Sequence, residues 1–229
     1  NYEQIRTTIA LNEMPVKICG MHAGVSVGPD GATHQMLEDV ALMRVLPHMT
    51  VINPADAEEA RKATIAAAKT KGPVYLRFGR SNVPIFTTAE TPFAIGKVLT
   101  LWDSPKPKLA IFVNGSLAYE TLLAARALYA DGIEVLVINV ATVKPLDAAT
   151  ILAAAKRAGR VMTVEEHQVA GGFGSAIAEY LSEHYPVPIK RLGMMDEFGQ
   201  SGNPDELIDH YGLAASSIRH MAEQFLHLA

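Results

Sequence analysis

The stretch MHAGVSVGPDGATHQ, residues 21–35, is the most informative part of this chain. Residues 16–20 before it form an apolar run typical of a strand, and residues 36–44 after it have helical periodicity. The glycines and the proline between them allow a loop to turn sharply and to approach a ligand closely. Ligands of α/β proteins bind at the carboxyl ends of strands, so we expect a binding site at this loop.

Three polar side chains of the loop, His22, Asp30 and His34, are candidates for chemistry. A histidine can donate to a substrate hydroxyl or move a proton near neutral pH, and an aspartate beside it can accept from a hydroxyl. If the turn winds into a helix at Thr33, Asp30 and His34 face one cavity. The alternative is structural, with Asp30 closing a turn, Thr33 capping the helix and His22 packing. Their spacing matches no zinc motif, so we expect no metal site.

Outward from the loop, helical and strand periodicity alternate, which predicts an α/β protein of two domains, each a mostly parallel sheet flanked by helices. We expect the domains at residues 1–84 and 108–229, joined by a linker, 85–107, with a strand pair near 95–102. The predicted strands are 16–20, 50–52, 73–78, 109–113, 134–140, 161–165 and 188–192, and the predicted helices are 2–12, 36–44, 56–70, 117–130, 147–158, 175–184, 204–210 and 214–226.

Composition narrows the class of protein. The chain has 229 residues, 49% of them apolar, and a formal net charge of −4, which gives ample core and no indication of nucleic-acid or membrane-surface binding. No run approaches the roughly 20 apolar residues of a membrane span, and no signal peptide is visible. The single cysteine, Cys19, lies in an apolar run, so we expect a buried thiol and a cytoplasmic protein.

Three other motifs have a functional and a structural interpretation. Arg77 and Arg80 close a predicted strand, where a guanidinium suits a phosphate; their spacing lets at most one face the site, and a surface ion pair is the alternative. Residues 171–175, GGFGS, either cradle a phosphate at a helix start or form a tight packing turn. Residues 165–167, Glu-Glu-His, are expected to be a charged loop cluster.

Together these motifs resemble the transketolase family of thiamine-diphosphate enzymes along essentially the whole chain. More closely, the chain is similar to the carboxy-terminal section of a split transketolase, whose other subunit carries the pyrophosphate-binding domain. The matching motifs are His22, Asp30-Gly31-Ala32-Thr33-His34-Gln35, Pro54-Ala55-Asp56, Gly72-Pro73, Arg80-Ser81-Asn82-Val83-Pro84, Val143-Lys144-Pro145-Leu146-Asp147, Val164-Glu165-Glu166-His167 and Gly171-Gly172-Phe173-Gly174-Ser175.

The resemblance implies a partial pyrimidine-binding domain followed by the transketolase carboxy-terminal domain. It implies transfer of a two-carbon ketol unit from a ketose phosphate to an aldose phosphate, as in the pentose phosphate pathway. His34 would be catalytic and would bind cofactor and substrate, Asp30 would recognise a hydroxyl, and His22 and Arg80 would bind the phosphate. Thiamine diphosphate and Mg²⁺ would be held mainly by the amino-terminal subunit, in a heterotetramer that also contains a second copy of this chain.

Two departures from the family pattern affect these expectations. Pro29 stands where the family has an acid, and the family's catalytic glutamate belongs to a segment upstream of Asn1. Residues 1–11 have the pattern of a helix interior, so we expect further residues upstream and no turnover by residues 1–229 alone.

Other family assignments remain open. A 1-deoxyxylulose-5-phosphate synthase shares the Asp30–Gln35 motif, although His22 favours transketolase. The remaining alternatives are the beta subunit of a 2-oxoacid dehydrogenase, a non-catalytic partner subunit and, with the wrong glycine pattern, a nicotinamide-dependent dehydrogenase.

Overall fold

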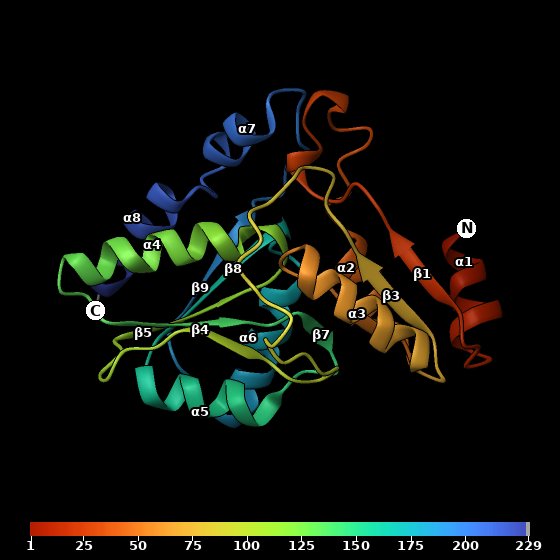
Figure 1. The fold of residues 1–229 in the computed structure, drawn as a ribbon, viewed down its shortest axis with the longest axis horizontal. Coiled ribbons are helices and arrows are strands. Elements are labelled where there is room, and N and C mark those ends of the chain that lie inside the picture. The colour runs from red at the N-terminus through yellow and green to blue at the C-terminus, as the bar shows by residue number, and fades with distance from the viewer. Residues whose placement is uncertain (228–229) are drawn as a thin grey trace.

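The computed structural model describes residues 1–227 and confirms an α/β protein with two mostly parallel sheets flanked by helices (Figure 1). The first sheet has the strand order β1-β3-β2-β7. Its strands β1 (Lys17–Gly20), β3 (Val74–Arg77) and β2 (Thr50–Ile52) are parallel, while β7 (Thr142–Lys144) pairs with β2 in the antiparallel sense. Since β1 is an edge strand, one side of this sheet is open.

The second sheet has the strand order β4-β6-β5-β8-β9. Its strands are β4 (Leu99–Trp102), β6 (Val135–Asn139), β5 (Leu109–Val113), β8 (Val161–Gln168) and β9 (Ile189–Met194). All pairs are parallel except β4 with β6. The strands β5 and β6 are buried throughout, as expected for strands covered by helices on both faces. The expected strand pair near 95–102 is wrong, because within the described chain only β4 forms there and its partner is β6.

Helices cover both faces of the second sheet, with α4 (Ala118–Ala130) and α8 (Ala215–His227) on one side and α5 (Ala148–Ala158) and α6 (Phe173–His184) on the other (Figure 1). Two helices, α2 (Asp39–Arg44) and α3 (Ala57–Lys69), pack on the first sheet. The remaining helical segments are α1 (Tyr2–Gln4), the π-helical η1 (Ile5–Ala10), the 3₁₀ segments η2 (Val25–Asp30) and η3 (Gly115–Leu117), and α7 (Pro204–His210). Within residues 1–227, no helix has the length and apolarity needed to cross a membrane.

Local chemistry accounts for where the clearest helices begin and end. Asp56 caps α3 by accepting a hydrogen bond from the Glu59 amide at 2.8 Å. Gly159 ends α5 in the left-handed conformation, with φ of 72°.

Two expectations near the loop are corrected. The helix after the loop begins at Asp39 rather than at residue 36. Cys19 is exposed rather than buried, because β1 lies at the sheet edge. An apolar run therefore did not guarantee a buried strand face here.

Candidate active site

The loop 21–35 lies beside the segment that follows β3. Because β1 and β3 are parallel neighbours, the segments that follow them leave the sheet at the same end. The Ala23 amide donates to the Phe78 carbonyl at 3.0 Å, and Arg80 Nη1 donates to the Val27 carbonyl at 2.9 Å. These bonds bring Arg80 onto the loop that the sequence singled out.

Asp30 and Arg80 form an ion pair on this surface. Arg80 Nη1 lies 3.1 Å from Asp30 Oδ2, and the two side chains are 39% and 37% exposed for Arg80 and Asp30 respectively. Arg80 makes its hydrogen bonds through Nη1, so within residues 1–227 its Nε and Nη2 have no acceptor. A guanidinium held in this way can still offer two donors to an anion.

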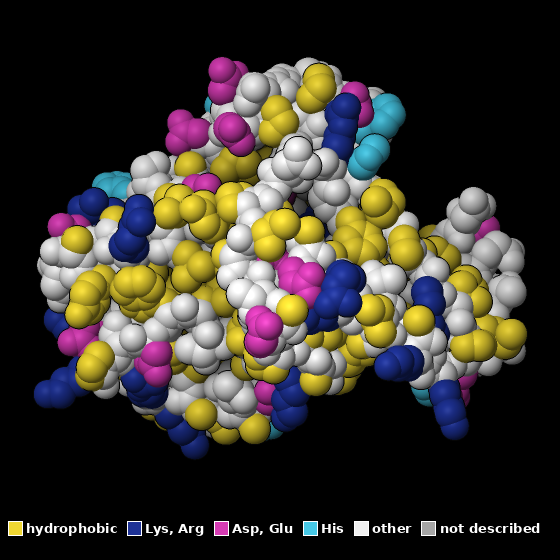
Figure 2. Space-filling view, viewed as in Figure 1, with side chains coloured by type: hydrophobic (Ala, Val, Ile, Leu, Met, Phe, Trp, Pro, Cys, Tyr) yellow, Lys and Arg dark blue, Asp and Glu magenta, His cyan; other side chains and the backbone are white. Residues whose placement is uncertain are grey.

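His22 and His34 are both exposed on the same loop. His22 takes a left-handed backbone conformation with φ of 58°, and His34 Nδ1 lies 2.9 Å from the Thr33 hydroxyl. The chain does not wind into a helix at Thr33, because none of residues 31–38 is helical and α2 begins at Asp39. Asp30 and His34 therefore share an exposed loop rather than a helix face. Figure 2 shows histidine, basic and acidic side chains gathered at the corner of the molecule that this loop forms.

A segment of the second half, residues 199–204, packs against the loop. The buried Gln35 amide donates to the Val25 carbonyl at 3.0 Å and to the Gln200 carbonyl at 2.9 Å. At Gly31, where φ is 70°, an added Cβ would lie 2.5 Å from Ser201 Oγ. This contact joins segments far apart in sequence, and no local signal predicted it.

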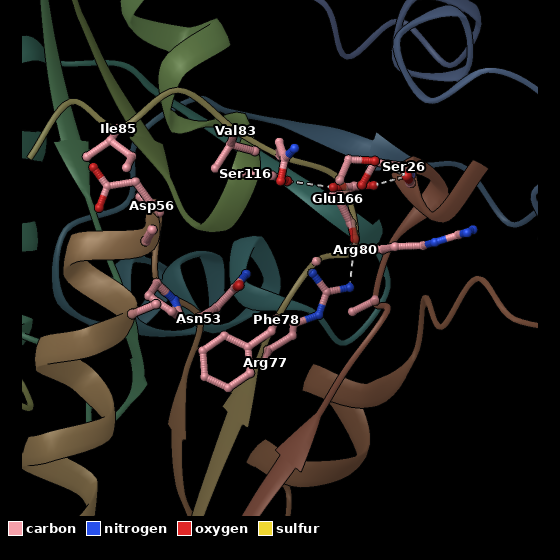
Figure 3. A pocket seen from close by; sticks show the side chains of 18 residues that line it. Ser26, Asn53, Asp56, Arg77, Phe78, Arg80, Val83, Ile85, Ser116 and Glu166 are labelled. Atoms are coloured by element: carbon pink, nitrogen blue, oxygen red, sulfur yellow. Dashed lines mark hydrogen bonds between the residues drawn. The ribbon is translucent and has the colours of Figure 1, made fainter.

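A cavity of about 440 Å³ adjoins the loop, at the carboxyl ends of strands from both sheets (Figure 3). Arg80 lines the cavity, whereas His22, Asp30 and His34 do not. Within it, Glu166 accepts hydrogen bonds from the Ser116 hydroxyl and from the Ser26 amide, both at 2.6 Å.

Arg77 is buried and pairs with Asp39, so of the two arginines only Arg80 faces the loop surface. Arg77 Nε lies 2.9 Å from Asp39 Oδ2, and its Nη2 donates to the Glu166 carbonyl at 2.8 Å. Burial would raise the pKa of Asp39, but the Arg77 guanidinium and the Tyr75 hydroxyl outweigh it, and the pKa lies below its usual value.

The expected loop cluster at residues 165–167 is wrong, because these residues are buried inside β8. Burial raises the pKa of Glu165 to about 8 and lowers the pKa of His167 to about 4. Glu165 accepts from the amides of Phe173 and Gly174 at 2.7 and 2.9 Å. The glycine-rich motif is therefore a packing turn whose helix start is occupied by the carboxyl group of Glu165 from the chain itself.

Comparison with known proteins agrees with this geometry. Residues 1–85 match the family "Transketolase, pyrimidine binding domain" and residues 96–218 match "Transketolase, C-terminal domain". The chain belongs to the transketolase family. This confirms the resemblance drawn from the motifs and makes the chain a member of a thiamine-diphosphate-dependent family.

The similar transketolases include separately encoded subunits. One subunit of an apulose-4-phosphate transketolase from Phocaeicola vulgatus is 37% identical over 98% of this chain and 71% of its own length. A putative transketolase C-terminal section from Methanocaldococcus jannaschii is 40% identical over 95% and 68%. A solved split-gene transketolase, described as an inactive beta4 tetramer, has a TM-score of 0.91 and 41% identity over 99% of this chain and 72% of that one.

Proposed function

We propose that this chain is the carboxy-terminal subunit of a transketolase that moves a two-carbon ketol unit from a ketose phosphate to an aldose phosphate. The observation that carries the proposal is the exposed loop on which Arg80 and Asp30 pair at 3.1 Å and which also bears His22 and His34. Similarity to separately encoded transketolase subunits supports it. One relative is named for apulose 4-phosphate, so the sugar has to be found by screening.

Each of the four side chains suits one step of binding or proton transfer. Arg80 offers to the substrate phosphate its Nε and Nη2, which no acceptor among residues 1–227 occupies, and His22 adds a donor from the same surface. Asp30 accepts from the hydroxyl beside the acceptor carbonyl. His34 engages Thr33 through Nδ1, which leaves Nε2 to hold or move a proton at a substrate hydroxyl.

Thiamine diphosphate would supply the carbanion that takes up the ketol unit, and we assign His34 to the side of the site that faces it. Among the described residues, no three His, Cys, Asp or Glu side chains form a group that could hold a metal ion. From the resemblance to a split transketolase, we assign Mg²⁺ and the diphosphate to an amino-terminal partner subunit. An exposed site fits completion by this partner in a cytoplasmic heterotetramer with a second copy of the chain.

The test assembles the chain with an amino-terminal transketolase subunit, thiamine diphosphate and Mg²⁺, and measures ketol transfer from a set of ketose phosphates. We expect His34→Ala to lower kcat by roughly 100-fold or more, as for loss of a group that moves a proton. His220→Ala, which removes an exposed histidine on α8, should leave kcat unchanged. Absence of transfer from every ketose phosphate contradicts the proposal.

The same assay separates the alternatives. Release of CO₂ from pyruvate would identify a 1-deoxyxylulose-5-phosphate synthase or a 2-oxoacid dehydrogenase. An assembled enzyme whose activity is unaffected by His34→Ala would identify a non-catalytic partner subunit.

A further inference from the structure

Glu166 is a buried carboxylate that reaches from the second half of the chain to the loop 21–35. It lies in β8, is 3% exposed, and has no cation within ion-pair distance of its carboxylate among residues 1–227. Burying a charge is costly unless hydrogen bonds compensate for the lost water. Packing alone does not explain a glutamate here, since an apolar side chain would fill the space without that cost.

The hydrogen bonds of Glu166 lead directly to the loop. Its Oε1 accepts from the Ser26 amide at 2.6 Å, at the start of η2, and its Oε2 is held by the Ser116 hydroxyl at 2.6 Å (Figure 3). A hydrogen bond from a backbone amide to a carboxylate is charge-assisted and stronger than one between neutral groups. The backbone also lies against the carboxylate, since a Cβ added at Gly24 would lie 2.2 Å from Oε1.

The restrained segment ends at the ion pair of the proposed site. The segment η2 runs from Val25 to Asp30 with a kink at Gly28, where φ is 81°, and Asp30 beyond the kink meets Arg80 at 3.1 Å. Arg80 is bonded to the same turn through the Val27 carbonyl. Holding the start of η2 therefore holds the Val27 carbonyl, which anchors Arg80, and Arg80 in turn pairs with Asp30 beyond the kink.

Other contacts from the second half restrain the end of the loop. The Gln168 amide donates to the Leu37 carbonyl at 2.9 Å, two residues beyond Glu166 along β8. Gln35 is bonded to the Gln200 carbonyl at 2.9 Å. Unlike Gln168 and Gln35, which make these contacts, Glu166 is an acidic residue and holds the start of η2.

We propose that Glu166 is a positioning residue, through which the carboxy-terminal half of the chain holds Asp30 and Arg80 in place for the sugar phosphate. This inference rests on the proposed function for its role in substrate binding. The second half of the chain would then contribute to the site indirectly, by holding the loop and not by contacting the substrate.

The test compares Glu166→Ala, Glu166→Gln and Ser116→Ala in the full chain, alone and assembled with its partner subunit. Alanine removes both hydrogen bonds of Glu166. Glutamine can accept from the Ser26 amide and donate to the Ser116 oxygen, so Glu166→Gln should behave nearly like the native chain. Exposed Glu183 on α6 provides the control, Glu183→Ala. The readouts are amide hydrogen exchange over residues 24–30 and the KM and kcat of ketol transfer.

For Glu166→Ala we expect exchange over residues 24–30 to rise by roughly tenfold or more, as for loss of one charge-assisted hydrogen bond. KM for the sugar phosphate should rise about fivefold with kcat within about twofold, and Ser116→Ala should show a smaller change in the same direction. If Glu166→Ala does not fold, Ser116→Ala decides the matter by the same readouts.

Unchanged exchange, or a loosened loop with unchanged KM, would overturn the proposal. If the native assembly transfers no ketol unit, the proposed function has failed. The exchange measurement on the chain alone still decides whether Glu166 holds the loop, because it needs neither cofactor nor substrate.

Discussion

Replacing Asp39 with alanine should remove much of the stability of the folded chain. Asp39 is 2% and Arg77 4% exposed, and Asp39 accepts from Arg77 Nε at 2.9 and 3.1 Å and from the Tyr75 hydroxyl at 2.7 Å. Without Asp39 the guanidinium keeps only the carbonyls of Met36 and Glu166, at 3.2 and 2.8 Å. Removing one partner of a buried ion pair costs about 3–5 kcal/mol, and this range includes the lost hydrogen bond of the Tyr75 hydroxyl.

We therefore expect Asp39→Ala to lower the free energy of unfolding by about 4 kcal/mol at pH 7, and Asp39→Asn by about half of that, because the amide oxygen still accepts one bond. Urea unfolding followed by circular dichroism measures this. The control is Asp131→Ala, which breaks an exposed ion pair with Arg219 at 2.6 Å and should cost less than about 1 kcal/mol.

The pH dependence of the same variant gives a second check. The pKa of Asp39 is lowered in the folded chain, so its contribution is present above the unfolded pKa and is lost as the pH falls through the folded one. The difference between the native chain and Asp39→Ala should shrink in acid. A loss below about 1 kcal/mol at pH 7 would refute the reasoning about a buried, unpaired guanidinium.

Smaller predictions concern Glu165, Gly31 and Cys19. Burial raises the pKa of Glu165 from 4.5 to about 8, so the contribution of this group to folding stability is lost as the pH rises over that range. In urea unfolding, the stability of Glu165→Gln relative to the native chain should rise by up to about 1.4 kcal/mol per pH unit. A constant difference between the two chains from pH 5 to 8 would contradict this. Gly31 and Gly132 both have a positive φ, of 70° and 76°, but only at Gly31 would an added Cβ contact another atom, Ser201 Oγ at 2.5 Å. Gly31→Ala should therefore reduce ketol transfer more than Gly132→Ala, and equal losses would be evidence against the contact between the loop and Ser201. Exposed Cys19 should react with a thiol reagent in the native chain; labelling only after denaturation would show that it is buried.

Local patterns predicted most of the fold because they carry their own cause. The cap at Asp56 and the left-handed Gly159 mark helix ends through chemistry within a few residues. The strand β7 was missed because three residues hold too little periodicity, and their pairing with β2 depends on a partner some ninety residues away in sequence.

The candidate site divides in the same way. The family resemblance assigned Arg80 and Asp30 to one site, and the two side chains lie together, as an ion pair between the loop and the segment after β3. The buried roles of Arg77 and Glu166 could not be predicted, since both depend on contacts across the two sheets. A charged residue in a sequence gives no sign of whether a distant partner will compensate for its burial.

The strand β7 also limits how a gene for this protein can be cut and recombined. It follows β5 and β6 in the chain, yet it covers the edge of β2 in the first sheet. A chain ending within residues 85–107 would leave that edge with unpaired amides and carbonyls, which invite pairing with other molecules and aggregation. A chimera that joins this first half to a foreign second half must therefore supply a replacement for residues 142–144.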